Sequence, residues 1–411
     1  MSVSILPAQR KISVNGIPFD GNVTTFSYYE NLLSPFTTAS FTYVDTGNSV
    51  TSSTDPQKRV GTIRDSSYMR GNEVVKFKFE NSSGVLDFYS ENYMRVDSSS
   101  LLSQTSTTEI GQVRLVSQTR ERNFQNNVYE KFSGQVADSV KKILEEKLGY
   151  DSSNFQIQKA SIPYGFTGSN RTPYDVLLHL ASLSTPEGGD PGYFAYETKS
   201  GFHFKSMDYL MYHQPAVNQG SPYFYNGVFQ SDIEGDANAF KILSSPTYRD
   251  LNVSKMFKSG FHAEFRFMYE DQQKTFVRNY MLTENGKFES ISYPPYKPTR
   301  RYTMVVPRGM TDTKITKNTN NDPVDFLAQS VMRYNILMSQ AINILIPCNP
   351  NLEAGNVILC KFEKVTQDSK ELGGFNTGRY LILGLCHHFS ATESYTSLTI
   401  VRDNYGNANL G

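Results

Sequence analysis

Apolar and polar residues alternate in short segments over the first 115 residues, which predicts β-strands. The segment VVKFKFE, from Val74 to Glu80, alternates without a break, as expected of a half-buried antiparallel strand. Asn15-Gly16 is the residue pair that favours a type I′ hairpin turn. The polar stretch from Thr46 to Lys58 predicts a flexible loop. No helical period fits this region, so we expect a β-barrel or β-sandwich over residues 1–115.

From Glu130 onward, apolar residues recur with the period of an α-helix. Apolar side chains fall on one stripe between Glu130 and Leu148, and Gly149 then suits the end of a helix. The stripe consists of Phe132, Val136, Val140, Ile143, Leu144 and Leu148. A second helix is expected from Pro173, because Thr172 is a good N-cap and Asp175 lies near the positive end of the helix dipole.

Two aromatic-rich strands around the turn Lys199-Ser200-Gly201 complete the middle segment and predict a hairpin. The hairpin needs a cover for its aromatic side chains, and the apolar stripes of the helices at 130–148 and 173–184 need a partner. We therefore expect the helices to cover the hairpin in a compact α/β module over residues 116–212.

Strands return in the last part of the chain. A hairpin is expected around Asp271-Gln272-Gln273, followed at about 283–322 by a long excursion with little core. Asp322-Pro323-Val324-Asp325 repeats the capping pattern and predicts a helix. Four further strands close the chain: AINILIP, GNVILCKFEKV, GRYLILGLCHHFSA and YTSLTIVRD. Residues 213–411 are thus expected to form a second barrel, giving a mainly β fold of two antiparallel β-barrels joined by an α/β module.

The amino-acid composition argues against some classes of function. The 411 residues contain 40 Lys and Arg against 40 Asp and Glu, which argues against a nucleic-acid binder that depends on a dominant basic surface. Charged residues are 19% of the chain, below the roughly 25% of typical soluble proteins, which fits surfaces buried against partners. The absence of Trp counts against a glycan-binding cleft.

Three cysteines form no disulfide framework and indicate folding in a reducing compartment. The N-terminus lacks the pattern of a signal peptide, and no apolar run approaches the roughly 18 residues needed to span a bilayer. We therefore expect a protein made in a cytoplasm and not integrated in a membrane.

The triplet Cys386-His387-His388 raises the question of a zinc site. The run from Arg379 reads as a strand, so neighbouring side chains point to opposite faces, and His387 and His388 do not readily bind one metal. Cys348, Cys360 and Cys386 lack the paired spacing of a zinc ribbon. A strand with one buried Cys and histidines near its rim is favoured over a metal site.

No other segment carries a specific catalytic signature. His203 and His179 are isolated, and a packed or rim histidine is favoured for both. The chain has no G-x-S-x-G elbow, H-E-x-x-H motif or Walker loop, and the glycines from Gly373 join two strands rather than a strand and a helix. We assign no catalytic, cofactor-binding or metal-binding residue and no cofactor, and expect a protein that is not an enzyme.

Two segments resemble the central baseplate hub proteins of T-even-like contractile-tailed phages. The first runs from Ile162 to Leu210 and joins a Pro-led helix to the hairpin GYFAYETKSGFHFKS. The second contains NPNLEAGNVILCKFEKV and GRYLILGLCHHFSATESYTSLTIVRDNYG. Its matching positions are Gly355, Gly378, Tyr380, His388, Tyr395, Leu398 and Arg402. Asn356 departs from the pattern, since an acidic residue is more usual there. The segments cover about a third of the chain, and residues 1–115 resemble the family only in strand content.

The resemblance implies a virion structural protein of the tail baseplate, assembled in the host cytoplasm. In this family, whose fold also forms the upper part of type VI secretion spike proteins, two barrels per chain assemble as a homotrimer. The resulting ring of six barrels joins the hexameric tail tube to the trimeric central spike and leaves a channel for DNA ejection. The implied partners are the tube or tube-initiator proteins and the spike, and further the tape measure and wedge proteins. DNA would pass without specific binding.

Two alternatives belong to other function classes. One is a hub-associated peptidoglycan hydrolase, although no remaining stretch is long enough for a lysozyme-like domain; a turbidity assay on peptidoglycan tests it. The other is a glycan-binding adhesin that uses the excursion at 283–322, which a glycan array tests.

Overall fold

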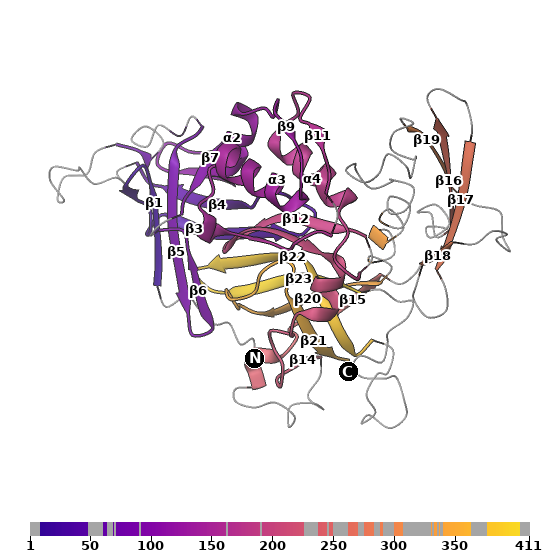
Figure 1. Ribbon diagram of the computed structural model, residues 1–411. Coiled ribbons are helices and arrows are strands. Elements are labelled where there is room, and N and C mark those ends of the chain that lie inside the picture. Colours follow the sequence, from indigo (N-terminus) through magenta and orange to yellow (C-terminus); the bar gives the residue numbers. More distant parts are fainter. Residues whose placement is uncertain are drawn as a thin grey trace, which may run out of the picture.

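Strands dominate the architecture of the protein in its computed structural model (Figure 1). The structure describes residues 9–47, 61–63, 69, 71–89, 92–161, 163–189, 191–225, 237–244, 246–249, 262–269, 275–282, 288–290, 300–306, 330, 333–334, 337, 340–362 and 376–402. A large sheet lies below a group of short helices, as Figure 1 shows. No helix in these ranges is long and apolar enough to cross a membrane.

The large sheet contains 14 strands from both ends of the chain. Eight come from the N-terminal part: β1 Gln9–Val14, β2 Ile17–Pro18, β3 Val23–Asn31, β4 Thr38–Asp45, β5 Val74–Asn81, β6 Gly84–Asp87, β7 Met94–Gln104 and β8 Glu109–Ser117. Six come from the C-terminal part: β14 Tyr223–Phe224, β15 Thr247–Arg249, β20 Gln340–Pro347, β21 Val357–Lys361, β22 Gly378–Ser390 and β23 Ser394–Arg402. The main path runs β15-β20-β23-β22-β3-β4-β8-β7-β5-β1-β2.

A single strand pair joins the two ends of the chain within this sheet. β22 pairs antiparallel with β3 over seven residue pairs, from Gly384↔Asn31 to Ser390↔Thr25. We call this pair the seam. The expectation of two separate closed barrels is therefore not met in the described part of the chain, where strands of both halves form one open sheet. Local alternation predicts each strand but carries no information about which distant strand it joins.

The alternation seen in the sequence explains how the sheet is buried. In β5 and β4, every second residue is buried, as the pattern predicted. The buried face of the N-terminal strands forms an aromatic core that includes Phe26, Phe77 and Phe79, and Phe389 of β22 stacks on Phe79 at 4.3 Å. At the turn between β1 and β2, Asn15 and Gly16 both have positive φ, which confirms the predicted type I′ turn.

The middle of the chain forms the predicted helix-covered hairpin. β12 Tyr193–Thr198 pairs with β13 Gly201–Ser206, and β10 Phe155–Ile157 adds a parallel strand. The helices are α2 Gln118–Gln125, α3 Val136–Ile143, a π-helical turn Leu144–Leu148, and α4 Pro173–Leu183. The apolar faces of α3, the π-helical turn and α4 share one core with Phe202 and Phe204 of the hairpin, which confirms the predicted packing.

The details of this module agree with the sequence-based expectations only in part. Thr172 caps α4, accepting from the Asp175 N–H at 3.4 Å, as expected. The first helix begins at Val136 rather than near Glu130, because Gly134 has φ +93° and interrupts it. Phe132 lies instead in the short strand β9 Lys131–Phe132, paired with β11 Phe166–Thr167. The helix α2 was not predicted, since QTRERNFQ has almost no apolar stripe.

A separate four-stranded sheet contains part of the segment expected to be an excursion. Its order is β18-β17-β16-β19, with bounds Phe288–Ser290, Thr275–Leu282, His262–Tyr269 and Arg300–Val306. The hairpin of β16 and β17 was predicted. Within the segment at 283–322, expected to be a long excursion with little core, residues 288–290 and 300–306 form strands. The predicted helix start at Asp322 lies outside the described residues.

Candidate functional site

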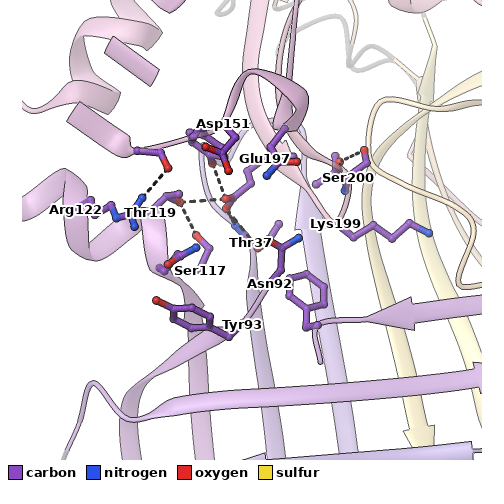
Figure 2. Close-up of a pocket in the computed structure, with 17 residues that line it drawn as sticks. Thr37, Asn92, Tyr93, Ser117, Thr119, Arg122, Asp151, Glu197, Lys199 and Ser200 are labelled. Carbon is purple, nitrogen blue, oxygen red and sulfur yellow. Dashed lines mark hydrogen bonds between the residues drawn. The ribbon is translucent and has the colours of Figure 1, made fainter. Parts of the chain in front are cut away.

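The tip of the hairpin β12–β13 is the point where the α/β module meets both halves of the large sheet. The tip consists of Glu197, Thr198, Lys199 and Ser200. Figure 2 shows Glu197 at the centre of one side of the tip, with the Lys199 side chain directed away from it. Gly201 follows with φ +119°, and a Cβ there would lie 2.1 Å from the Asn154 carbonyl oxygen. The tight turn therefore requires glycine at this position.

Glu197 anchors the tip to the N-terminal strands and to α2. Its carboxylate accepts from the Thr37 N–H at 2.9 Å, from Thr119 Oγ1 at 3.0 Å and from the Tyr150 hydroxyl at 2.6 Å. Burial raises the pKa of Glu197, and the hydrogen bonds from these donors oppose that rise. Because both carboxylate oxygens are occupied as acceptors, Glu197 acts as a structural anchor.

Glu30 holds the opposite side of the tip from within β3. Its carboxylate accepts from the Lys199 N–H at 2.7 Å, from the Ala354 N–H at 2.8 Å and from the Tyr28 hydroxyl at 3.0 Å. One carboxyl group thus links the hairpin, an N-terminal strand and the turn that precedes β21. Burial, and next the negative charge of Glu353, raise the pKa of Glu30 to about 8.

Glu353 supplies the third carboxylate at the tip, from the C-terminal half of the chain. It accepts from the Thr198 hydroxyl at 2.8 Å and from the Ser200 hydroxyl at 2.6 Å. The Lys199 ammonium lies 3.9 Å from Glu353 and also donates to the Pro350 carbonyl oxygen. The tip is therefore held by the carboxyl groups of Glu30 and Glu353 and by two backbone groups, the Thr37 N–H and the Pro350 carbonyl oxygen.

Gly355 explains one of the glycines in the C-terminal sequence motif. It has φ +84°, and a Cβ at this position would lie 2.3 Å from the Tyr196 hydroxyl. The turn before β21 can therefore approach the hairpin only with glycine here. This close approach brings Glu353 and Ala354 to the tip.

Ser200, His203 and Glu353 lie close enough to suggest a hydrolytic triad, but the arrangement does not fit one. Ser200 Oγ lies 3.3 Å from His203 Nε2, yet it donates to Glu353, and the other ring nitrogen, Nδ1, has no hydrogen-bond partner. A triad needs the carboxylate on that second nitrogen, where it orients the base. Burial also lowers the pKa of His203 to about 3, which makes it a poor general base near neutral pH.

A polar cavity of about 680 Å³ opens beside the Glu197 side of the tip. It is bordered by the β8–α2 turn, by Gly149 to Asp151 after the π-helical turn, and by Asn92 and Tyr93 just before β7. Arg122 on its wall donates to the carbonyl oxygens of Leu148 and Gly149, both at 2.8 Å, and so ties two walls together. These two contacts hold the walls of the cavity together.

The triplet that raised the zinc question lies in β22, as predicted. His387 is fully buried; its Nδ1 lies 2.9 Å from Thr396 Oγ1 and its Nε2 lies 3.3 Å from the Leu352 carbonyl oxygen. His388 is on the other face, 2.9 Å from Ser27 and stacked on Tyr395 at 4.7 Å. Cys348 and Cys360 are buried and Cys386 is half-buried. In the described ranges, no three His, Cys, Asp or Glu side chains are grouped so as to hold a metal ion.

One face of the large sheet carries small polar side chains on both sides of the seam. Residues on this face are opposite one another in register and most are half-buried. They include Thr25, Ser27, Ser40, Thr42, Cys386, His388, Ser390, Ser397 and Thr399. We call them the hydroxyl face. The larger side chains of Tyr29 and Tyr395 lie on the same face, opposite Cys386 and His388. Farther along, Arg114 of β8 adds an exposed charge.

The outer half of β7 presents an open strand edge. β5 pairs with β7 only at Arg95 and Met94, and every residue from Asp97 to Gln104 is exposed. No described strand pairs with that side of residues 97–104. The edge sequence DSSSLLSQ has no Lys or Pro and only one charge, so it lacks the usual protection against pairing with another chain.

The three carboxylates at the tip were not singled out from the sequence. A signal exists for Glu30, because it follows Phe26 and Tyr28 at a period of two and therefore falls on the buried face of its strand. The positions of Glu197 and Glu353 depend on contacts between distant segments, which no local pattern contains.

Comparison with known proteins identifies the fold. No protein-family model and no curated protein matches the chain by sequence. Among solved structures, the chain is similar to the 43 kDa tail protein of prophage MuSo2 from Shewanella oneidensis, with a TM-score of 0.53, 10% identity and 97% of each chain covered. It is also similar to a tail protein from Neisseria meningitidis MC58, with a TM-score of 0.53, 10% identity, and 96% of this chain and 97% of that chain covered. The chain therefore has the fold of these tail proteins, which confirms, at the level of fold, the resemblance carried by its motifs.

Proposed function

We propose that the protein is a structural baseplate hub of a contractile phage tail, a homotrimer between the tail tube and the central spike. The observation that carries this proposal is the seam, where seven residue pairs of β22 and β3 join strands of both halves of the chain side by side. Each chain then offers two sheet segments in a row, and three chains offer six. A three-fold protein can in this way match a six-fold tube. The tail-protein fold supports the same conclusion.

The open edges of the sheet support closure between chains. β7 presents its unprotected edge at residues 97–104, and the path of the sheet ends on the other side with β20 and the short β15. Contact between unlike edges of neighbouring copies is heterologous, and such contacts close into a ring when the rotation permits. We propose that the β7 edge of one copy faces the β20 side of the next.

The hydroxyl face supports the proposed channel. Serine and threonine side chains offer a wetted surface with little charge, which suits a polyanion that must pass without being held. We propose that this face lines the channel for DNA. The division into residues 1–115, 116–212 and 213–411, with the first and last parts supplying the quasi-equivalent surfaces, belongs to the same proposal.

Chemical cross-linking tests the ring. A chain with Cys386→Ser as background carries Ser100→Cys on the β7 edge and Leu243→Cys beside β20, and is treated with a short bismaleimide. Leu243 is exposed, and its N–H donates to the Leu345 carbonyl oxygen of β20. The double variant, alone or with its spike protein, is expected to give covalent species up to three chains, with each chain of 46.4 kDa. Each single variant is the matched control and is expected to give none. Monomers alone in every sample would overturn the proposal.

A further inference from the structure

The hairpin tip holds two carboxylates against one ammonium group. Glu30 and Glu353 both accept hydrogen bonds from the tip, and the Lys199 ammonium group lies 3.9 Å from Glu353 and close enough to Glu30 to interact with its charge. Glu30 has 2% of its surface exposed, so water cannot screen a charge there. With both carboxyl groups ionised, the cluster carries an excess negative charge inside the protein, which is unfavourable.

We propose that the hairpin tip is a proton-dependent latch, in which a proton on Glu30 keeps the α/β module fastened to both halves of the large sheet. The geometry carries this inference, because Glu30 is buried close to a second carboxylate with one ammonium group for the two of them, and the same carboxyl group meets the Lys199 N–H of the hairpin and the Ala354 N–H of the C-terminal turn from its place in β3. The two N–H donors favour the ionised carboxyl group and so oppose part of this effect. Loss of that proton acts on all three segments at once. The latch is independent of the proposed assembly.

The charge balance gives the direction of the effect. With Glu30 protonated, the negative charge of Glu353 is matched by Lys199. The raised pKa of Glu30, about 8, means that the closed tip binds this proton more tightly than an open tip, where the carboxyl group meets water and returns toward its ordinary value of 4.5. The population of the open form relative to the closed form therefore increases as pH rises from near 5 to near 8. Above pH 8 it does not increase further.

The other groups around Glu30 do not change charge in this window. Burial raises the pKa of Tyr28 and of Tyr196, which keeps both phenols neutral. His387 of β22 lies near Lys199, and burial lowers its pKa to about 3, so it is neutral as well. His203, which is hydrogen-bonded to Thr198, is also neutral, because burial lowers its pKa to about 3. Burial lowers the pKa of Lys199, while the charges of Glu353 and Glu30 oppose that change.

Hydrogen exchange of the full-length protein between pH 6 and pH 8 tests the latch. The two informative amides are those of Lys199 and Ala354, which donate to Glu30. After correction for the intrinsic exchange rate, their opening constant is expected to rise by about tenfold per pH unit. Segments in the β22–β23 pair serve as the internal control and are expected to change little.

Two variants separate the latch from simple loss of packing. Glu30→Gln, which cannot ionise, is expected to show opening that does not depend on pH in this window. Glu353→Gln removes the neighbouring charge that raises the pKa of Glu30, so the pH dependence is expected to level off at a lower pH. This second variant decides the matter if the first does not fold. A wild-type profile without pH dependence, or a Glu353→Gln profile identical to wild type, would overturn the proposal.

Discussion

Ser27 and His388 are separated by 361 positions in the sequence, and their side chains lie within hydrogen-bond distance, 2.9 Å, across the seam. The two residues are opposite each other in the register of β3 and β22. His388 also stacks on Tyr395 of β23, so three strands from both ends of the chain meet through side chains at this point. The seam is thus supported by side-chain contacts in addition to its backbone ladder.

Ser27→Ala should weaken the seam. Removal of the hydroxyl group loses a partly buried hydrogen bond, with an expected cost of about 0.5–1.5 kcal/mol in the free energy of unfolding. Ser40→Ala is the matched control, because Ser40 lies opposite Ser27 on the same face of β4. Denaturant titration measures both. Equal losses in the two variants would show that the His388 contact contributes nothing.

Phe204→Ala should strongly destabilise the α/β module. The side chain is fully buried in the core between the hairpin and the helices, so the cavity should cost about 3–5 kcal/mol in the free energy of unfolding. Tyr129→Ala, at a position with 64% of its surface exposed, is the comparison and should cost less than about 1 kcal/mol. Chemical denaturation gives both values; a loss below about 1 kcal/mol for Phe204→Ala contradicts the burial of its ring.

Gly355→Ala and Gly16→Ala separate backbone strain from steric conflict. Both glycines have positive φ, +84° and +81°, but only the Cβ at position 355 meets another group, the Tyr196 hydroxyl. Gly16→Ala should cost about 1–2 kcal/mol of unfolding free energy from strain alone, and Gly355→Ala clearly more. Adding Tyr196→Phe, which removes the hydroxyl group, should restore part of the loss. Thermal unfolding that ranks Gly16→Ala as the more harmful change would contradict this account.

Acid should destabilise the protein partly through its buried histidines. Burial lowers the pKa of His387 and of His203 to about 3, whereas an unfolded histidine has a pKa near 6.5. Below pH 6.5 the unfolded chain therefore binds more protons than the folded one, and stability falls as pH drops toward 3. His203→Phe should reduce this dependence by up to about 1.4 kcal/mol per pH unit. Unfolding curves at pH 4 to 7 measure the slope; an unchanged slope would indicate that His203 is not held neutral.

Local pattern predicted most elements, and contacts between distant segments account for the differences. The β22 strand, the cap at Thr172 and the turn at Asn15-Gly16 depend on neighbouring residues and were found as expected. The seam could not be predicted, because alternation in β3 and in β22 is equally compatible with separate barrels.

The candidate site shows the same division between local and distant information. Rejection of a shared metal at His387 and His388 follows from strand alternation alone, and the structure places the two rings on opposite faces. The network at the hairpin tip, by contrast, depends on Glu30, Glu197 and Glu353 meeting from three parts of the chain. Glu30 carries a local signal, its place on the buried face of its strand, whereas Glu197 and Glu353 read as ordinary polar positions in their own segments.

The seam also constrains the order in which the chain can complete its fold during synthesis. β3 ends at Asn31, whereas its partner in the seam begins pairing at Gly384, so the ribosome must synthesise the whole chain from Asn31 to Gly384 before the pair can form. Until then β3 has β4 on one side and an open edge on the other. Such late, non-local pairing is slow and leaves a nascent chain exposed to association with other chains. A truncated product that ends before β22 is therefore expected to aggregate rather than to persist as a folded fragment.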